Sequence, residues 1–277
     1  MPEPEAEGLP EARLDDVLVL TTRKTFWATP AARLFSRVLH TWILFGRSGN
    51  FWNAGILFFR ALFSILFRRP KVLVIGSAPR LSAWFARLKK RGLLGRTKLL
   101  AVGHLEFGYD LVPHFARIVV HARAERDIRE RESGVRGRYA YLPLPASGVK
   151  DRAPSARAED FLFAGGRAKR DFRTLIKAVK SLPVRLRIVT RDRSSIDWPD
   201  PLPGNVEFRP FKPLEAFLQD LRDARFVVVP LFGGERFSHG QTTVVQAMRL
   251  GRAVISTRGA TVDDYVVHGE TGLLVEP

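Results

Sequence analysis

The chain has 277 residues, 45% of them hydrophobic, and its 45 Lys and Arg exceed its 28 Asp and Glu to give a net charge of +17. This length and composition are typical of a globular protein with one large domain or two ordinary ones. The absence of cysteine excludes disulfides, thiolate metal sites and a cysteine nucleophile. The basic excess predicts an anionic partner (nucleic acid, an anionic membrane surface or a phosphorylated small molecule), unless it is only a solvated arginine surface.

The N-terminal region changes character twice before residue 71. Residues 1–14 are rich in Pro and Glu and are predicted to be a disordered acidic leader. They lack the basic and apolar regions of a secretory signal, so a cytoplasmic location is expected. A strand is predicted at 15–22, and an apolar block interrupted by Arg covers 26–69.

The apolar block is a candidate membrane-interfacial segment. Its stretch FWNAGILFFRALFSILFRR is too short and too often interrupted to span a bilayer. On a helix its polar side chains would share an arc of about 80°; they are Asn53, Arg60, Ser64 and Arg68. Two interpretations stay open: a helix that lies in a membrane interface, and a helix buried between the sheet and its neighbours.

From residue 71 onward, predicted strands and helices alternate, which is the pattern of a parallel sheet with helices on both faces. In the first half, strands are expected at 71–78, 97–103, 117–121 and 138–145, and helices at 80–92 and 122–134. The small, polar stretch 148–159 predicts a linker. After it, strands are expected at 161–166, 184–190, 205–210, 225–231, 253–257 and 271–277, and helices at 171–182, 213–224 and 238–250. The expected fold is therefore α/β, with two Rossmann-like βαβ domains, 15–147 and 160–277, that face each other across a cleft.

One helix start in the second domain has the features of an anion site. Ser238 followed by Gln241 has the spacing of a capping box. A strand, a glycine-containing loop and this helix follow one another, which presents free backbone N–H groups and the positive end of the helix dipole. Gly240 would let a ligand approach the backbone closely. A phosphate group fits such a position.

A second strand end, near residue 165, carries a similar arrangement. Gly165 and Gly166 follow a predicted strand, and Arg167 and Arg170 come just before the next helix. Two guanidinium groups at this spacing can clamp a diphosphate through their planar donor geometry. Asp171 is the expected N-cap of the helix. Together the two strand ends predict a diphosphate site.

The second domain resembles the nucleotide-sugar domain of GT-B glycosyltransferases of the group 1, retaining, family 4-like type. The stretches that carry the resemblance run in the family's order over roughly 160–277: GGRAKRDFRTLIKAV, DARFVVVPL, VVQAMRLGRAVIST and DDYVVHGETGLLVEP. The first domain is similar to the family only in its βα rhythm and in the segment RIVVHARAERDIRE. The resemblance implies a donor nucleotide-sugar held mainly by the second domain and an acceptor that enters from the first.

The resemblance also implies roles for single residues. Arg167 and Arg170 would bind the donor diphosphate, with Gly165 and Gly166 beside them. The backbone around Phe211 would face the base. Asp264 stands where the family carries an acid near the donor, although a helix cap is an equal alternative.

The chain departs from the family at its pair of glutamates, whose positions are taken here by Ser238 and Gln246. Gln246 can still hydrogen-bond a ribose hydroxyl, whereas Ser238 is short and carries no charge. The polar contacts to the diphosphate or sugar would then fall to Gln241, Thr242 and Thr243. The S-x-G-Q-T form resembles a recurring variant of the family.

The expected chemistry is transfer of a sugar, hexosyl-like and retaining, with departure of a nucleoside diphosphate. Arg167, Arg170 and the helix-start amides would stabilise the charge on the leaving group, so no metal and no cofactor is required. His104, at a strand end of the first domain, is the candidate base, and a structural role is its alternative.

The expected acceptor is a polysaccharide or a lipid-linked molecule, and the expected location is cytoplasmic and peripheral on the inner face of the cell membrane. Two other classes stay open. One is a non-catalytic sugar-nucleotide-binding partner subunit, suggested by the missing glutamates. The other is a basic nucleic-acid-binding protein on a degenerate transferase fold, which is less favoured because no nucleic-acid-binding motif is found.

Overall fold

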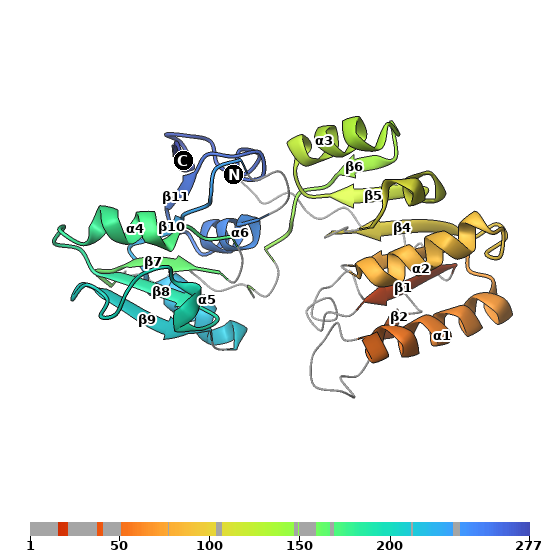
Figure 1. The fold of residues 1–277 in the computed structure, drawn as a ribbon, viewed down its shortest axis with the longest axis horizontal. Coiled ribbons are helices and arrows are strands. Elements are labelled where there is room, and N and C mark those ends of the chain that lie inside the picture. The colour runs from red at the N-terminus through yellow and green to blue at the C-terminus, as the bar shows by residue number, and fades with distance from the viewer. Residues whose placement is uncertain are drawn as a thin grey trace, which may run out of the picture. The chain divides into compact units, whose positions relative to one another are not determined.

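The computed structural model describes residues 16–21, 38–40, 51–76, 78–103, 107–146, 149, 159–166, 169–211, 213–234 and 239–277. The chain forms two compact units, each built on its own sheet (Figure 1). The first unit contains the residues up to Val120 together with Arg129–Ala140, and the second contains His121–Ile128 together with Tyr141–Pro277. The predicted leader 1–14 and nearly all of the predicted linker 148–159 lie outside the described residues.

The first unit has a six-stranded sheet in the order β2-β1-β3-β4-β5-β6. Its strands are β1 Val17–Thr21, β2 Val38–His40, β3 Val72–Gly76, β4 Lys98–Val102, β5 Arg117–Val120 and β6 Tyr139–Tyr141. Strands β1 to β5 pair in parallel. The helices of this part of the chain are α1 Phe51–Arg68, α2 Pro79–Lys90, the 3-10 helix η3 Tyr109–His114 and α3 Arg123–Ser133.

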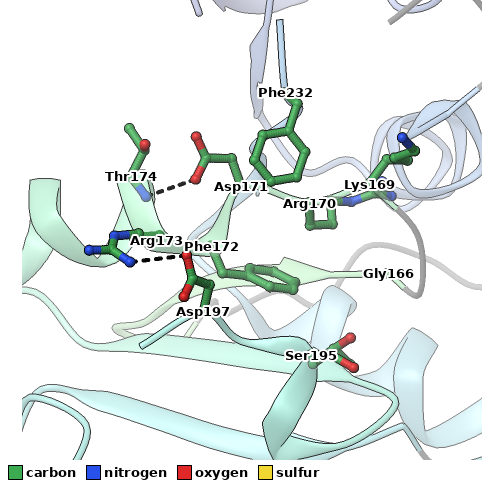
Figure 2. Close-up of a pocket in the computed structure, with 11 residues that line it drawn as sticks. Gly166, Lys169, Arg170, Asp171, Phe172, Arg173, Thr174, Ser195, Asp197 and Phe232 are labelled. Atoms are coloured by element: carbon green, nitrogen blue, oxygen red, sulfur yellow. Dashed lines mark hydrogen bonds and ion pairs between the residues drawn. The ribbon is translucent and has the colours of Figure 1, made fainter. Parts of the chain in front are cut away.

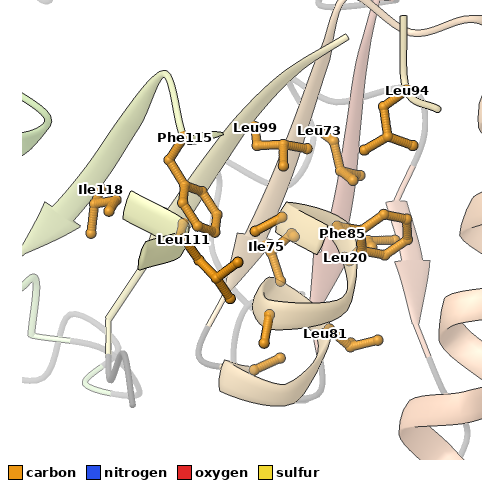
Figure 3. Packing of buried hydrophobic residues seen from close by; sticks show 14 of the residues in the cluster. Leu20, Leu73, Ile75, Leu81, Phe85, Leu94, Leu99, Leu111, Phe115 and Ile118 are labelled. Carbon is orange, nitrogen blue, oxygen red and sulfur yellow. The ribbon is translucent and has the colours of Figure 1, made fainter. Parts of the chain in front are cut away.

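Alternate residues of the parallel strands form the core of the first unit. Leu20, Leu73 and Ile75 are fully buried and lie on one face of the sheet, since side chains on a strand alternate between its two faces. Leu81 and Phe85 of α2 pack on this face (Figure 3). Burial of these large side chains positions α2 against the sheet.

Helix α1 buries only one side. Ala61 and Ile65 are buried in the same core, and the Phe58 ring lies 5.3 Å from Trp84 and 4.9 Å from Phe85 of α2. The opposite side exposes a stripe of large apolar side chains, so a helix buried on all sides is not what the structure contains. In the part of the chain that the structure describes, no helix is long and apolar enough to cross a membrane.

The second unit has a six-stranded parallel sheet in the order β12-β11-β10-β7-β8-β9. Its strands are β7 Leu162–Gly165, β8 Leu186–Thr190, β9 Val206–Pro210, β10 Phe226–Val229, β11 Val254–Thr257 and β12 Gly272–Val275. Its helices are α4 Phe172–Val179, the 3-10 helix η4 Arg193–Ser195, α5 Leu214–Asp223 and α6 Gln241–Arg249.

Helices cover both faces of this second sheet, as predicted. Phe163 of β7 packs with Phe217 of α5 and Val244 of α6 in one buried cluster. The next residue, Ala164, packs on the opposite face with Ile176 of α4. This alternation along one strand is the arrangement of a doubly covered parallel sheet.

Candidate functional site

The carboxyl ends of three neighbouring strands meet at one cavity of the second unit. Strands β7, β8 and β10 are adjacent and parallel, so their carboxyl ends lie on the same edge of the sheet. The cavity there has a volume of about 470 Å³ (Figure 2). Its lining includes Gly166, Lys169, Arg170, Thr190, Asp197 and Phe232. Ligands bind at this edge in open parallel sheets.

Arg170 is held in place by backbone contacts on both sides. Its backbone pairs with Leu231 in an isolated antiparallel bridge, and its Nε donates to the carbonyl of Gly165 at 3.2 Å. Gly166 has φ +139°, and a Cβ at that position would lie 2.5 Å from the Arg170 guanidinium. Glycine is therefore favoured at 166, because a side chain there would displace the guanidinium and other residues rarely adopt this φ.

The burial of Arg170 lowers the pKa of its guanidinium, but the group still carries its charge at neutral pH. Burial lowers the pKa of Arg170 from its ordinary, higher value to about 10. The guanidinium consequently remains a cation at neutral pH, in surroundings where water screens it less than on an open surface. A partly desolvated cation at a cavity is suited to bind an anion strongly.

The amino end of α4 also lines the cavity. Asp171 is the N-cap of the helix, as predicted, and its Oδ1 accepts a hydrogen bond from the backbone N–H of Thr174 at 3.0 Å. Arg173 donates to Asp197 at 3.1 Å, which joins the helix to the loop after η4 (Figure 2). All four of these residues line the cavity, so the two bonds hold part of its wall in place.

The predicted capping box at α6 is wrong. The helix begins at Gln241, and Gly240, with φ +85°, is its N-cap. Gln241 therefore takes the first helical position and cannot act as the third residue of a box that starts at Ser238. A Cβ at Gly240 would lie 3.1 Å from Val229 and 3.2 Å from Leu231. Since Leu231 also pairs with Arg170, the α6 start and the Arg170 turn adjoin the same residue.

The side chain of Gln241 is committed to the protein itself. It is buried, and its Nε2 donates to the carbonyls of His121, at 3.0 Å, and Thr261, at 2.8 Å. Both residues belong to the same unit as Gln241. Both protons of the side-chain amide are thereby used, so Gln241 links the start of α6 to His121 and Thr261.

Replacing Gln241 with Leu is expected to lower the free energy of unfolding by about 1–2 kcal/mol, because two carbonyls lose a buried donor. Thermal or urea unfolding without nucleotide measures this. Thr242→Val is the matched control on the next, exposed position and is expected to change stability little. Equal stability of the two variants would contradict a structural role for Gln241.

The other polar residues of α6 differ in exposure. Thr243 and Gln246 are buried, whereas Thr242 is exposed. Of the four polar side chains predicted on this helix, Thr242 is the one that faces solvent in the described structure. Ligand contacts of Gln246 and Thr243 stay predictions.

Asp264 and Phe211 lie elsewhere in the second unit. The Asp264 carboxylate accepts from the backbone N–H of Arg123 at 2.5 Å and from its guanidinium at 2.9 Å. Phe211 packs on Phe217, with 5.2 Å between ring centroids, and its N–H donates to the carbonyl of Thr190. Asp264 thus binds the first residue of α3 from a distant part of the sequence, and no helix begins at Asp264 itself.

Three predicted site residues, His104, Arg167 and Ser238, lie outside the described residues. Other lining residues were missed by sequence reasoning. Lys169, Thr190 and Phe232 had a usable signal, since each stands just beyond or at the end of a predicted strand. Ser195 and Asp197 had none, because Ser195 ends a short 3-10 helix and Asp197 lies in the loop after it.

A family comparison matches the part of the chain that forms this cavity. The model of the family "Glycosyl transferases group 1" matches residues 158–277. Residues 158–277 belong to the group 1 glycosyl transferases. This group 1 domain therefore contains Gly166 and Arg170 and the whole of the second sheet. No curated protein matches the chain by sequence.

Solved structures of low identity share the fold of the whole chain. A glycosyltransferase from Rickettsia africae has a TM-score of 0.63 and 11% identity, over 94% of this chain and 84% of that one. An α-glucosyltransferase in complex with UDP-glucose and DNA containing an abasic site has 0.57 and 10%, over 93% and 83%. The lipopolysaccharide outer core galactosyltransferase WaaB, in its apo form, has 0.54 and 12%, over 87% and 71%. Together with the group 1 domain, these likenesses confirm the predicted α/β fold of the GT-B type.

Proposed function

We propose that this chain transfers a sugar from a nucleoside-diphosphate sugar to a glycan or lipid-linked acceptor. The observation that carries the proposal is Arg170, a partly buried cation at the strand-end cavity of a group 1 glycosyl transferase domain. A cavity of this volume accommodates a nucleotide-sized ligand. The proposal places the donor diphosphate against Arg170 and the start of α6.

The chemistry assigned to these residues is stabilisation of a leaving group. The bond between the anomeric carbon of the donor sugar and the β-phosphate oxygen breaks, and negative charge grows on the diphosphate. A hydroxyl oxygen of the acceptor bonds to the same carbon and gives its proton to the base. The Arg170 guanidinium and the backbone amides at the start of α6 stabilise that charge, because the protein holds them in place before the reaction. Arg167 is assigned the same role from the family resemblance, and His104 is the candidate base.

Metal independence is part of the proposal. In the described ranges of the chain, no three His, Cys, Asp or Glu side chains gather as metal ligands would. The proposed stabilisation rests on Arg170 and on backbone amides, so a chelator should leave donor binding unchanged. The proposed outcome at the sugar is retention of configuration.

The acceptor is assigned by class. Two structural neighbours are a lipopolysaccharide outer core galactosyltransferase and an α-glucosyltransferase in complex with DNA. The proposed acceptor is a glycan or a lipid-linked molecule, and DNA is included among the acceptors that are tested. One observation favours a second candidate, a non-catalytic partner subunit: Ser238 and Gln246 stand where the family carries glutamates.

A nucleotide panel tests the proposal. Melting temperature is measured with UDP, GDP, ADP and TDP, with and without their sugars, in the presence and absence of EDTA. A rise of the melting temperature that selects one base and survives EDTA is expected, since a ligand that binds only the folded state stabilises it. Absence of any rise would overturn the donor site. A selective rise without turnover of the matching donor on glycan, lipid-linked or DNA acceptors would favour the partner subunit.

A further inference from the structure

Helix α1 exposes a continuous apolar stripe that no part of the proposed sugar chemistry uses. Four side chains form it, each between 60% and 72% exposed: Phe59, Phe63, Leu66 and Phe67. Their spacing of four, three and one residues puts them within about 100° on a helix. The ring centroids of Phe63 and Phe67 lie 4.2 Å apart, so the two rings form one surface. Isolated exposed apolar residues need no explanation, but a contiguous stripe marks an interaction surface.

A groove beside the stripe mixes apolar walls with cations. Helices α1 and α2 lie side by side (Figure 1). The groove at their junction has a volume of about 550 Å³ and is lined by Phe58, Phe59, Trp84 and Leu88, with Arg87 and Arg91 among its residues. Both arginines are exposed. An aromatic and aliphatic centre with arginines beside it matches the layers of a lipid surface.

The charged side chains of α1 and α2 are all cations, and one of them, Lys90, pairs with Asp110 at 3.4 Å. Neither α1 nor α2 contains an Asp or Glu, whereas the chain as a whole has 28. The basic residues of the two helices and the residue after α2 are Arg60, Arg68, Arg80, Arg87, Lys89, Lys90 and Arg91. Two copies of this face would bring like charges together, which disfavours a self-associated dimer. An anionic surface meets the cations favourably.

We infer that the α1–α2 face binds the surface of a bilayer containing anionic phospholipids, with the α1 stripe in the acyl region and Arg87 and Arg91 on lipid phosphates. Helix α1 would lie in the interface, parallel to the membrane plane. The stripe alone would give weak, reversible attachment, and the cations would make it dependent on anionic lipid and on salt. The inference does not depend on the proposed sugar transfer.

Vesicle flotation of the full chain tests the inference. Vesicles of phosphatidylcholine alone are compared with vesicles of equal parts phosphatidylcholine and phosphatidylglycerol. Binding to the second kind only is expected, with strong weakening at about 0.5 M NaCl, where charges are screened over a few ångströms. The variant Phe63→Gln/Phe67→Gln should bind at least about tenfold more weakly. The affinity of the Arg87→Gln/Arg91→Gln variant for the anionic vesicles should fall about fivefold for each cation removed.

Matched variants separate this surface from a general change in the chain. Leu142→Gln/Leu182→Gln removes two side chains that are 55% and 52% exposed in the second unit, and Arg136→Gln/Lys177→Gln removes two exposed cations elsewhere. Both controls should bind vesicles like the wild type. Far-ultraviolet circular dichroism and the melting temperature without nucleotide verify that each variant is folded.

Three results would overturn the inference. The first is wild-type binding that does not distinguish neutral from anionic vesicles. The second is vesicle binding of the Phe63→Gln/Phe67→Gln variant equal to that of the wild type or of the matched leucine control. The third is a wild-type dimer in sedimentation velocity that the phenylalanine variant abolishes, without vesicle binding by either, because the occupant of the stripe would then be a second copy.

Discussion

The Arg170→Ala variant is expected to lose between about a hundredfold and about a thousandfold in kcat/KM for sugar transfer. The guanidinium is held at the cavity by the Gly165 carbonyl and by the bridge to Leu231, so its position is set before a ligand arrives. A preorganised cation acts mainly on the charge that develops in the transition state. Initial rates with the donor found in the nucleotide panel, and the affinity for its nucleoside diphosphate, measure the loss.

Two further variants sharpen this prediction. Arg185→Ala, which removes an exposed arginine that donates to the Asp160 carbonyl, should leave the rate unchanged. Arg170→Lys keeps a cation but lacks the planar fork, so its activity should lie between those of the wild type and Arg170→Ala. Full activity of Arg170→Ala would refute the assignment of this residue.

The pH dependence follows from the lowered pKa of Arg170. The wild-type guanidinium is charged below a pKa of about 10 and loses its proton as the pH rises through that value. Nucleotide affinity should therefore be constant from pH 7 to about 9 and fall above 10. In Arg170→Lys the fall should begin at a lower pH, because the ordinary pKa of Lys is about 10.4 and the same burial lowers it further.

The Gly165→Ala variant is expected to lose about 3 kcal/mol of unfolding free energy, at the upper end of the cost of overpacking. A Cβ at this position would lie 2.5 Å from the ring of Phe163 and 2.7 Å from that of Phe217. Phe163 is fully buried and Phe217 nearly so, and neither ring has room to move within a packed core. The melting temperature should fall by roughly 6–12 °C.

Gly204→Ala is the matched control for this substitution. Nothing lies within 4 Å of a Cβ at Gly204, and its φ is not in the left-handed region. Stability should stay within about 0.5 kcal/mol of the wild type or rise slightly, because alanine restricts the unfolded chain. A Gly165→Ala variant as stable as Gly204→Ala would mean that the two rings can rearrange at little cost.

Most of the fold could be predicted because its elements have strong periodicity. The buried strands around Leu73 and Val228 are apolar and β-branched, and the helices between them repeat at 3.6 residues, so their positions were predicted within a few residues. Strand β2, Val38–His40, was missed because its three residues are too short a run to stand out within a long apolar block. Helix η3 was missed because its six residues show no clear period.

The candidate site could be predicted less completely. The glycines at 165 and 166 and Arg170 follow a strand end, and local sequence order is enough to bring them together. The role of Gln241 could not be predicted, because its partner His121 is 120 residues away. Local spacing suggested a capping box, whereas long-range hydrogen bonds determine where this side chain points.

The partition of α3 has a consequence for recombination of the chain. Residues 121–128 belong to the second unit, where His121 accepts hydrogen bonds from Gln241 and Tyr265, and Arg123 pairs with Asp264. A chimera that transplants 158–277 alone onto another protein would remove the partners that Gln241, Tyr265 and Asp264 have in residues 121–123. The transplantable module is therefore discontinuous in sequence, and fusion points chosen at the linker alone should give unstable hybrids.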